Sequence, residues 1–190
     1  MTDPGSPAKP LSGAPAQAAQ GPTDLPSIYR SELAYVWKTL RRLGAPPADL
    51  EDLAHDVFVV VHRHLSDYDP ARPLRPWLFG IAVRVVSDHR RVGRNSREIP
   101  GQDVEPVDGT PSAQDRLEGR EARALLMRAL DDIDLEQRAV LVMHDLDELP
   151  VPEIAATLSI PLNTAYSRLR LARAAVVAWI ARFRGRDVAP

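Results

Sequence analysis

The stretch "VPEIAATLSIPLNTAYSRLRLAR", from Val151 to Arg173, decides the fold of the second half of the chain. Its first part predicts a short helix, because apolar residues recur there at helical spacing: Ile154, Ala155 and Leu158. The residues "SIP" interrupt this pattern, and a second helix is expected from about Asn163, with an inward face formed by Ala165, Leu169, Ala172 and Val176. The arrangement is typical of a helix-turn-helix, although an αα-hairpin with an exposed basic face would give a similar pattern.

The outward residues of the second helix are polar, aromatic or basic. In a helix-turn-helix the start of this helix enters the major groove of DNA, so the residues there are candidates to read base edges: Asn163, Thr164, Tyr166 and Ser167. The arginines of the same helix are candidates for phosphate or guanine contacts: Arg168, Arg170 and Arg173.

Charge is segregated along the chain, although the formal net charge is only -2. Residues 45–69 hold six acids and one arginine, and residues 70–97 hold seven arginines and one acid. The order then repeats, with eight acids and one arginine in residues 131–153 and six arginines and no acid in residues 163–186. We interpret the repeated order as two modules, in each of which the acidic and the basic block bind partners of opposite charge. The alternative interpretation is that the charged residues only form solvent-exposed helix faces.

The composition limits the class of protein. A chain of 190 residues with 44% hydrophobic residues can form one domain or two small ones. It has no cysteine, which excludes disulfides and thiolate chemistry and fits a reducing cytoplasm. No apolar run approaches the roughly 20 residues that cross a bilayer, and the N-terminus has no apolar signal region. A cytoplasmic protein is therefore expected.

Three helices are expected in the first module. The first runs over residues 27–43 and ends at Gly44, which should adopt the left-handed conformation of a C′ residue. The second begins near Asp49, whose carboxylate is expected to cap exposed amides, and turns one face inward: Leu50, Leu53, Ala54, Val57, Phe58 and Val61. The third has Pro76 at its first position and buries Trp77, Leu78, Ile81, Ala82 and Val85.

The second module is expected to begin near Asp115. Its first helix uses Leu117, Leu125 and Leu126, and the next begins at "DLEQ", where Asp134 and Gln137 resemble a capping box. No strand pattern is present, so we predict an all-α protein of two small helical domains.

The expected boundaries follow from composition. The helical domains occupy residues 26–92 and 115–184, and the acidic, breaker-rich residues 93–114 form a flexible linker. Residues 1–25, rich in Pro, Ala, Gly and Ser, are expected to be a disordered tail, and residues 185–190 a short second tail.

Two blocks resemble the extracytoplasmic-function (ECF) sigma factors, the small two-domain members of the bacterial sigma-factor superfamily. The block "DLEDLAHDVFVVVHRHLSDYDPARPLRPWLFGIAVRVVSDHRR" is similar to the second sigma domain, with its acidic helix start, "DVF" and "PWLFGIA". The block "LDDIDLEQRAVLVMHDLDELPVPEIAATLSIPLNTAYSRLRLAR" is similar to the fourth sigma domain, whose helix-turn-helix reads promoter DNA. The resemblance covers about residues 27–91 and 115–184. It implies a promoter-specificity subunit that is not an enzyme and needs no cofactor.

The resemblance also implies roles for the charged blocks. The acidic helix would bind the clamp helices of the polymerase β′ subunit through Asp49, Glu51, Asp52, His55 and Asp56. The helical domain over residues 115–184 would bind the β flap. The loop over residues 66–75 would capture a flipped base of the minus-ten element, and the next helix would touch the melted strand. The matching residues are Tyr68, Arg72, Arg75, Arg84, Arg90 and Arg91. The Trp77 ring could also stack on a DNA base, but we prefer the interpretation that it packs in the core.

The helix-turn-helix would bind the minus-thirty-five element, and an anti-sigma factor is a further partner that the resemblance suggests.

The chain departs from the family pattern at several positions. Tyr166 stands where lysine is common, Asn163 and Ser159 where glycine is common, and Pro76 and Gly80 where threonine and arginine are common. An unusual promoter preference is therefore expected.

Two other functions are open on the sequence alone. The same helix-turn-helix could belong to a repressor, which would be a dimer on a palindromic operator. The protein could also be a metal-dependent phosphohydrolase, with a metal site formed by His55, Asp56, His62, His64, Asp88 and His89. Several of these residues lie beside arginines that would repel a cation. We assign no metal site and no catalytic residue.

Overall fold

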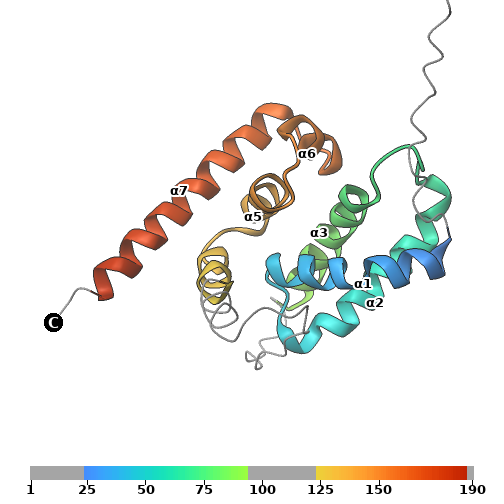
Figure 1. Cartoon of the computed structure of the whole chain (residues 1–190), viewed down its shortest axis with the longest axis horizontal. Coiled ribbons are helices and arrows are strands. Elements are labelled where there is room, and N and C mark those ends of the chain that lie inside the picture. The colour runs from blue at the N-terminus through green and yellow to red at the C-terminus, as the bar shows by residue number, and fades with distance from the viewer. Residues whose placement is uncertain (1–23, 94–122, 188–190) are drawn as a thin grey trace, which may run out of the picture.

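The computed structural model describes residues 24–93 and 123–187, and every regular element in these two ranges is helical (Figure 1). The all-α prediction is confirmed. The predicted tail over residues 1–25 and the predicted linker over residues 93–114 lie outside the described residues, except at their inner ends, and Leu117 lies outside them too. No helix within the described ranges is long and apolar enough to cross a membrane.

Helix α1 (Leu25–Arg42) is bounded by two specific local structures. At its start the Asp24 carboxylate accepts a hydrogen bond of 3.0 Å from the Ser27 N–H, which satisfies one of the exposed amides. At its end Gly44 has φ 81° and its N–H donates to the Arg41 carbonyl at 2.9 Å. The prediction for Gly44 is confirmed, because only glycine takes this left-handed conformation without strain.

Helices α2 (Leu50–His64) and α3 (Leu74–Gly93) pack against α1 and complete the first helical unit. All six residues predicted to face inward from α2 are buried. The capping prediction for Asp49 is wrong: its carboxylate makes no capping bond and lies 3.0 Å from His89 Nε2, which ties the start of α2 to α3. Helix α3 begins at Leu74, so Pro76 lies inside the first turn instead of at its first position.

The second helical unit contains residues 123–131, α5 (Leu135–Leu141), α6 (Val151–Thr157) and α7 (Leu162–Asp187). A π-helical turn, Val142–Leu146, extends α5. The capping box predicted at Asp134 is absent, since its side chain makes no capping bond. Ser159, between α6 and α7, has φ 54°, so it takes the left-handed conformation that would favour the glycine common in the family.

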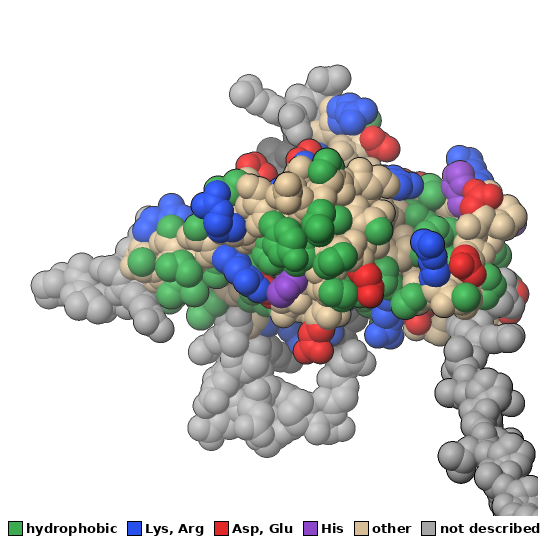
Figure 2. All heavy atoms as spheres, turned by 90° about the horizontal axis from the view of Figure 1, so that it is seen from above, with side chains coloured by type: hydrophobic (Ala, Val, Ile, Leu, Met, Phe, Trp, Pro, Cys, Tyr) green, Lys and Arg blue, Asp and Glu red, His purple; other side chains and the backbone are tan. Residues whose placement is uncertain are grey.

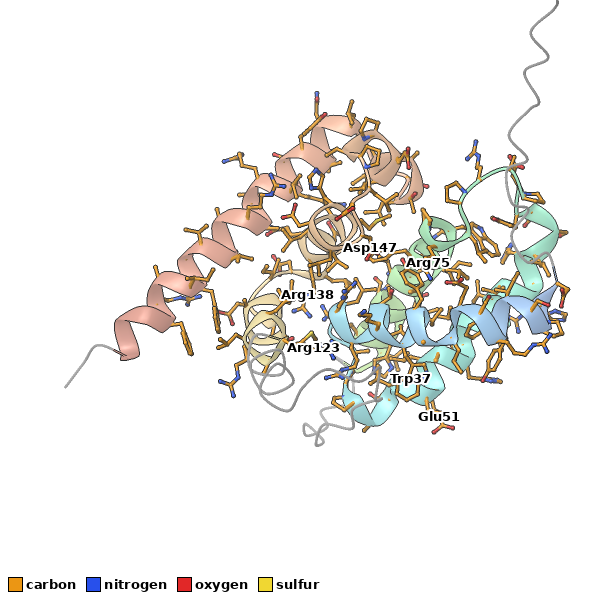
Figure 3. All side chains as sticks on the ribbon, in the orientation of Figure 1. Trp37, Glu51, Arg75, Arg123, Arg138 and Asp147 are labelled. Atoms are coloured by element: carbon orange, nitrogen blue, oxygen red, sulfur yellow. The ribbon has the colours of Figure 1, made fainter. Side chains whose placement is uncertain are left out.

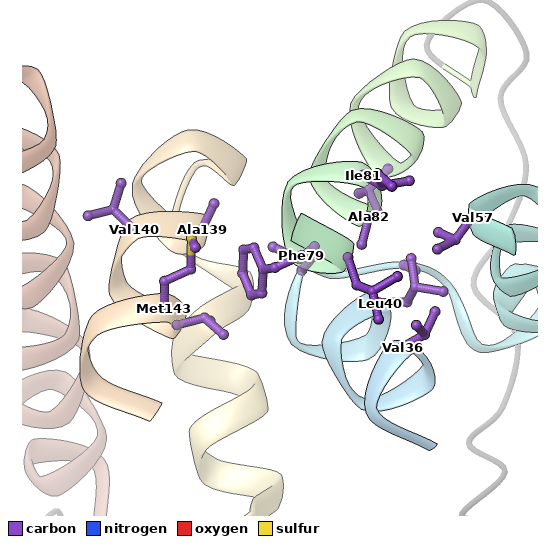
Figure 4. Packing of buried hydrophobic residues seen from close by; sticks show 14 of the residues in the cluster. Val36, Leu40, Val57, Phe79, Ile81, Ala82, Ala139, Val140 and Met143 are labelled. Atoms are coloured by element: carbon purple, nitrogen blue, oxygen red, sulfur yellow. The ribbon is translucent and has the colours of Figure 1, made fainter. Parts of the chain in front are cut away.

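One hydrophobic core runs through both units. It includes Val36 and Leu40 of α1, Val57 of α2, and Ala139 and Met143 of the second unit. Phe79 of α3 lies between these two groups and is fully buried (Figure 4). The sequence patterns predicted two small helical domains, and they did not predict a core shared between them.

Candidate nucleic-acid interface

The helix-turn-helix has the predicted form. Helices α6 and α7 are joined by a turn over residues 158–161 and pack against each other, with Ala155 of α6 and Ala165 of α7 both buried. Leu169 and Ala172 continue the buried face of α7. The predicted inward face is therefore confirmed.

A stripe of exposed residues follows the opposite side of α7, and we call it the reading stripe: Asn163, Tyr166, Ser167 and Arg170. These residues are spaced at i, i+3, i+4 and i+7, so they share one helix face. Tyr166 is 52% exposed although its ring is large and apolar. Thr164 is half-buried and lies beside the stripe. The arrangement presents amide, phenol, hydroxyl and guanidinium groups to solvent along about two helical turns.

The other two predicted arginines of α7 are paired inside the second unit. Arg168 makes an ion pair with Glu136 of α5. Arg173 donates from Nε to Asp145 at 3.1 Å, and its Nη2 lies 3.1 Å from His144 Nδ1. The hydrogen bond from Arg173 holds the pKa of the Asp145 carboxyl below its usual range. Both arginines therefore brace α7 against α5 and the π-helical turn in this structure.

Arg170 differs from these two arginines. Within residues 24–93 and 123–187 it forms no ion pair, and its side chain is exposed. The charge pattern predicted that the acidic block over residues 131–153 faces an outside partner. Two of its acids, Glu136 and Asp145, instead neutralise arginines of the same unit. No sequence signal could have shown these pairs, because the partners are 28 and 32 residues apart and only the fold brings them together.

The loop that precedes α3 holds the minus-ten candidates. Tyr68 is half-buried, its ring centroid lies 5.0 Å from that of Trp77, and its O–H donates to the Arg72 carbonyl at 2.6 Å. Burial raises the pKa of Tyr68. Trp77 is partly buried against the core, in agreement with the packing role preferred for it. Arg72 is 81% exposed, with Asp69 3.7 Å away.

Arg75 lies in a cleft between the two helical units (Figure 3). The cleft has a volume of about 410 Å³, and its lining includes Tyr35, Lys38, Asp147 and Glu148. Arg75 Nε donates to Glu32 at 3.0 Å, and the guanidinium stands 5.0 Å from the centre of the Tyr35 ring. The hydrogen bond to Glu32 raises the pKa of Arg75. Arg75 is therefore held in place and shares its cleft with residues of the second unit.

The three arginines predicted on α3 have different environments. Arg84 and Arg91 are exposed and lie seven residues apart, on one face of the helix. Arg90 is half-buried and donates to the carbonyls of Leu43 and Gly44 at 2.8 and 3.3 Å. Arg84 and Arg91 thus share one exposed face of α3, with Arg91 3.9 Å from Asp88, whereas Arg90 binds the end of α1.

The candidates for polymerase binding on α2, three acids and one histidine, are exposed on its outer side: Glu51, Asp52, His55 and Asp56. Asp49 lies apart from them, because it is paired with His89. No group of three or more histidines and carboxylates converges within the described part of the chain as a metal site would require. His64, drawn into the metal hypothesis, instead lies 2.9 Å from Asp67.

Lys and Arg side chains are visible at both ends of the face seen in Figure 2, over α7 on the left and over the first unit on the right, with hydrophobic side chains gathered between them. On this face the basic side chains are therefore divided between the two units.

Comparison with known proteins agrees with this division. Residues 28–96 match the family model described as Sigma-70 region 2, and residues 123–176 match the one described as Sigma-70, region 4. The ECF RNA polymerase sigma factor SigL of Mycobacterium tuberculosis is 30% identical over 149 residues, which cover 77% of this chain and 82% of SigL. The chain belongs to the ECF family of RNA polymerase sigma factors.

Other members of the family give the same result. RNA polymerase sigma factor CnrH of Cupriavidus metallidurans is 30% identical over 142 residues, covering 70% of this ECF sigma factor and 74% of CnrH. The solved structure of CnrH in complex with the cytosolic domain of CnrY has a TM-score of 0.59 and 25% identity, covering 83% of this chain and 88% of that one. The structure of the sigma factor RpoE from Bartonella quintana, in complex with the anti-sigma factor NepR, has a TM-score of 0.58 at 21% identity and supports the fold.

Proposed function

We propose that this ECF sigma factor recognises its promoters through two separate surfaces, one on each helical unit. A promoter-specificity sigma factor joins core RNA polymerase and directs transcription initiation, as the region 2 and region 4 matches indicate. The reading stripe on α7 would contact the minus-thirty-five element. Tyr68, Arg72, Arg75, Arg84 and Arg91 would contact the minus-ten element.

The reading stripe is the observation that carries the proposal. Four side chains that can make hydrogen bonds share one exposed face at the start of the second helix of a helix-turn-helix. Arg170 provides the cation on this face. Arg168 and Arg173 would reach phosphates only by leaving Glu136 and Asp145, so their main role would be to position α7.

Core polymerase would bind mainly to the acidic outer face of α2, formed by Glu51, Asp52, His55 and Asp56. This acidic face would complement a positively charged surface on the β′ clamp helices. The second unit would contact the β flap. Asp49 contributes less to this face, because His89 occupies its carboxylate. We propose no catalytic residue and no cofactor, and we propose that the protein acts in the cytoplasm, together with the polymerase and its DNA.

An anti-sigma factor is a further proposed partner. The CnrH structure contains the cytosolic domain of CnrY, and the RpoE structure contains the anti-sigma factor NepR. A protein of this kind would compete with core polymerase.

The experiment is a competition for core RNA polymerase. The purified protein is mixed with core enzyme free of other sigma factors, and the complex is challenged with the primary sigma factor. A stable one-to-one complex that the primary sigma factor displaces supports the proposal. A folded protein that does not bind core polymerase would contradict the proposal. The alternative function, a dimeric repressor, would then be tested by measuring the molecular mass of the protein in solution.

A further inference from the structure

Tyr29 of α1 is a large aromatic residue to which the proposed function gives no role. It is 45% exposed, and its ring centroid lies 4.7 Å from that of Phe58 of α2, with an angle of 59° between the two ring planes. Phe58 is buried, and tilted contacts of this kind are a favourable arrangement of two aromatic rings. The Tyr29 ring is therefore fixed by packing on one side and open to solvent on the other.

The position of Tyr29 gives this exposure a meaning. A single exposed apolar residue is ordinary on a protein surface. Tyr29, however, lies at the end of the first unit that also carries the minus-ten loop, residues 65–73 between α2 and α3. Figure 1 shows the start of α1, the end of α2 and this loop gathered there, away from α7. The exposed ring is therefore close to a surface for which we propose a DNA contact.

Glu32 links Tyr29 to the proposed minus-ten surface. It follows Tyr29 by three residues, so the two side chains are neighbours on α1, with about 5–6 Å between their Cβ atoms. The Glu32 side chain is only 12% exposed, and it accepts a hydrogen bond of 3.0 Å from Arg75 Nε. Two residues after Arg75, the Trp77 ring is in contact with that of Tyr68. A series of contacts thus leads from the minus-ten loop to the Tyr29 ring.

The charges at this end of the unit leave two arginines without an acid. The acids there each have a partner within the protein: Asp24 accepts from the Ser27 N–H, Glu32 accepts from Arg75, Asp67 lies 2.9 Å from His64, and Asp69 lies 3.7 Å from Arg72. Arg30, next to Tyr29, and Arg63, in the last turn of α2, are exposed and form no ion pair within residues 24–93 and 123–187. Arg30 Nε donates to the Pro26 carbonyl at 3.2 Å, which uses one of its five N–H donors. Both arginines can therefore contact phosphates.

An exposed aromatic ring beside unpaired arginines is a chemistry that suits single-stranded nucleic acid. Every base has a π-face, so such a ring accepts an unpaired base of any kind, while the cations contact the phosphates. Bases in a duplex are stacked on each other, so a base must leave the stack before it can reach an isolated ring. In the proposed function the melted non-template strand is the single strand that passes the minus-ten loop.

We propose that Tyr29 is a second stacking platform for the melted non-template strand, which holds an unpaired base beyond the one held by the minus-ten loop, with Arg30 and Arg63 at the adjoining phosphates. This proposal rests on the proposed function, because it needs the minus-ten loop on the same strand. The ring should accept any base, so Tyr29 stabilises the opened promoter and does not select its sequence.

The first experiment identifies what lies against position 29 in the working complex. Holoenzyme is assembled from core polymerase and the Tyr29→p-benzoylphenylalanine variant, and it is bound to a promoter that the wild-type holoenzyme selects from a random library, with the minus-ten region pre-melted. Irradiation should cross-link position 29 to the non-template strand. Cross-links from this position to a polymerase subunit alone would overturn the inference, since the surface would then be a protein interface.

A second cross-linking position separates the inference from the proposed function. Arg72→p-benzoylphenylalanine places the same group at an 81% exposed position of the minus-ten loop. Cross-links to DNA from position 72 but not from position 29 would overturn the inference and leave the minus-ten surface in place. If no holoenzyme forms, or if neither position cross-links to DNA, the proposed function fails and the inference fails with it.

Substitutions test whether the contact is stacking. Tyr29→Leu removes the aromatic face, so its holoenzyme should bind the pre-melted promoter about 5- to 150-fold more weakly, the range that one stacked base contributes. Its affinity for a duplex with only the minus-thirty-five element should not change. Tyr29→Phe and Tyr29→Trp keep an aromatic ring and should keep the wild-type affinity. Equal weakening on both DNAs, or a loss in Tyr29→Phe as large as in Tyr29→Leu, would overturn the inference. If Tyr29→Leu does not fold, the cross-linking result decides.

The salt dependence of binding tests the two arginines. Arg30→Gln and Arg63→Gln should each lower the salt-dependence slope for the pre-melted promoter by about 0.7, the value for one contact to a single strand. Arg128→Gln, at an exposed position of the second unit, is the matched control and should leave the slope unchanged. Slopes that neither Arg30→Gln nor Arg63→Gln alters would overturn the placement of the strand beside these arginines.

Discussion

Arg42 of α1 and Asp147, which directly follows the π-helical turn, form an ion pair with 3.0 Å between Arg42 Nη1 and Asp147 Oδ1 across 105 residues of sequence. Both side chains are mostly shielded from water. Since the same carboxylate accepts from Tyr35, one side chain of the second unit satisfies two donors of the first.

Removal of this carboxylate should destabilise the protein. Asp147→Ala leaves the Arg42 guanidinium and the Tyr35 hydroxyl without their partner in a shielded site, so we expect a loss of about 1–3 kcal/mol in the free energy of unfolding, measured with urea. Asp132→Ala is the matched control, because the Asp132–Arg182 pair is exposed and should contribute less than about 1 kcal/mol. Equal effects of the two substitutions would argue against a special role for Asp147.

Arg170 should contact DNA phosphate or guanine directly. Arg170→Ala is expected to weaken promoter binding and to lower the salt-dependence slope by about one unit, measured by titration of a minus-thirty-five duplex at several salt concentrations. Arg173→Ala should have a smaller effect on the slope, because Arg173 is paired with Asp145. A slope unchanged by Arg170→Ala would remove this residue from the interface.

The outer face of α2 should decide polymerase binding. Asp52→Lys combined with Asp56→Lys reverses the charge of this face and should abolish the complex with core polymerase, while circular dichroism stays unchanged. Asp88→Lys, at an exposed position of α3, should leave the complex intact. Retained binding by the double variant would show that another surface docks the enzyme.

Tyr166 should determine part of the promoter preference. It is half exposed in the middle of the reading stripe. Tyr166→Lys should therefore change the minus-thirty-five sequences selected from a random library by the holoenzyme. Identical selection profiles for the two proteins would show that Tyr166 reads no base.

The Asp145–Arg173 pair should make stability depend on pH in the acid range. The pKa of Asp145 is lower in the folded protein than its ordinary value, so the pair stabilises the fold above that ordinary value and loses this contribution as the pH falls through the lowered pKa. Between about pH 5 and pH 3, wild type should lose more stability than Asp145→Asn, measured by urea unfolding at each pH. Parallel curves for the two proteins would contradict the assignment.

Local patterns predicted the individual helices well. The inward face of α2 and the buried residues of the helix-turn-helix are confirmed because each depends on a repeat of 3.6 residues within one segment. Gly44 is confirmed for a similar reason, since a C′ residue is defined by its own helix. The capping predictions at Asp49 and Asp134 are wrong. Asp49 is attracted to His89, a residue that only the fold brings near.

The sequence by itself determined the helices, their buried faces and the family, because these depend on short-range spacing and on motifs within one segment. Only the tertiary structure decided which charges remain available: Arg170 is exposed on the reading stripe, whereas Arg168 and Arg173 are paired with acids of α5 and the π-helical turn. Tertiary structure also decided that Phe79 and Gly80 serve the contact between the units. Such pairings join residues far apart in the chain, and the attraction between two charges depends on their distance in space, which no local pattern contains.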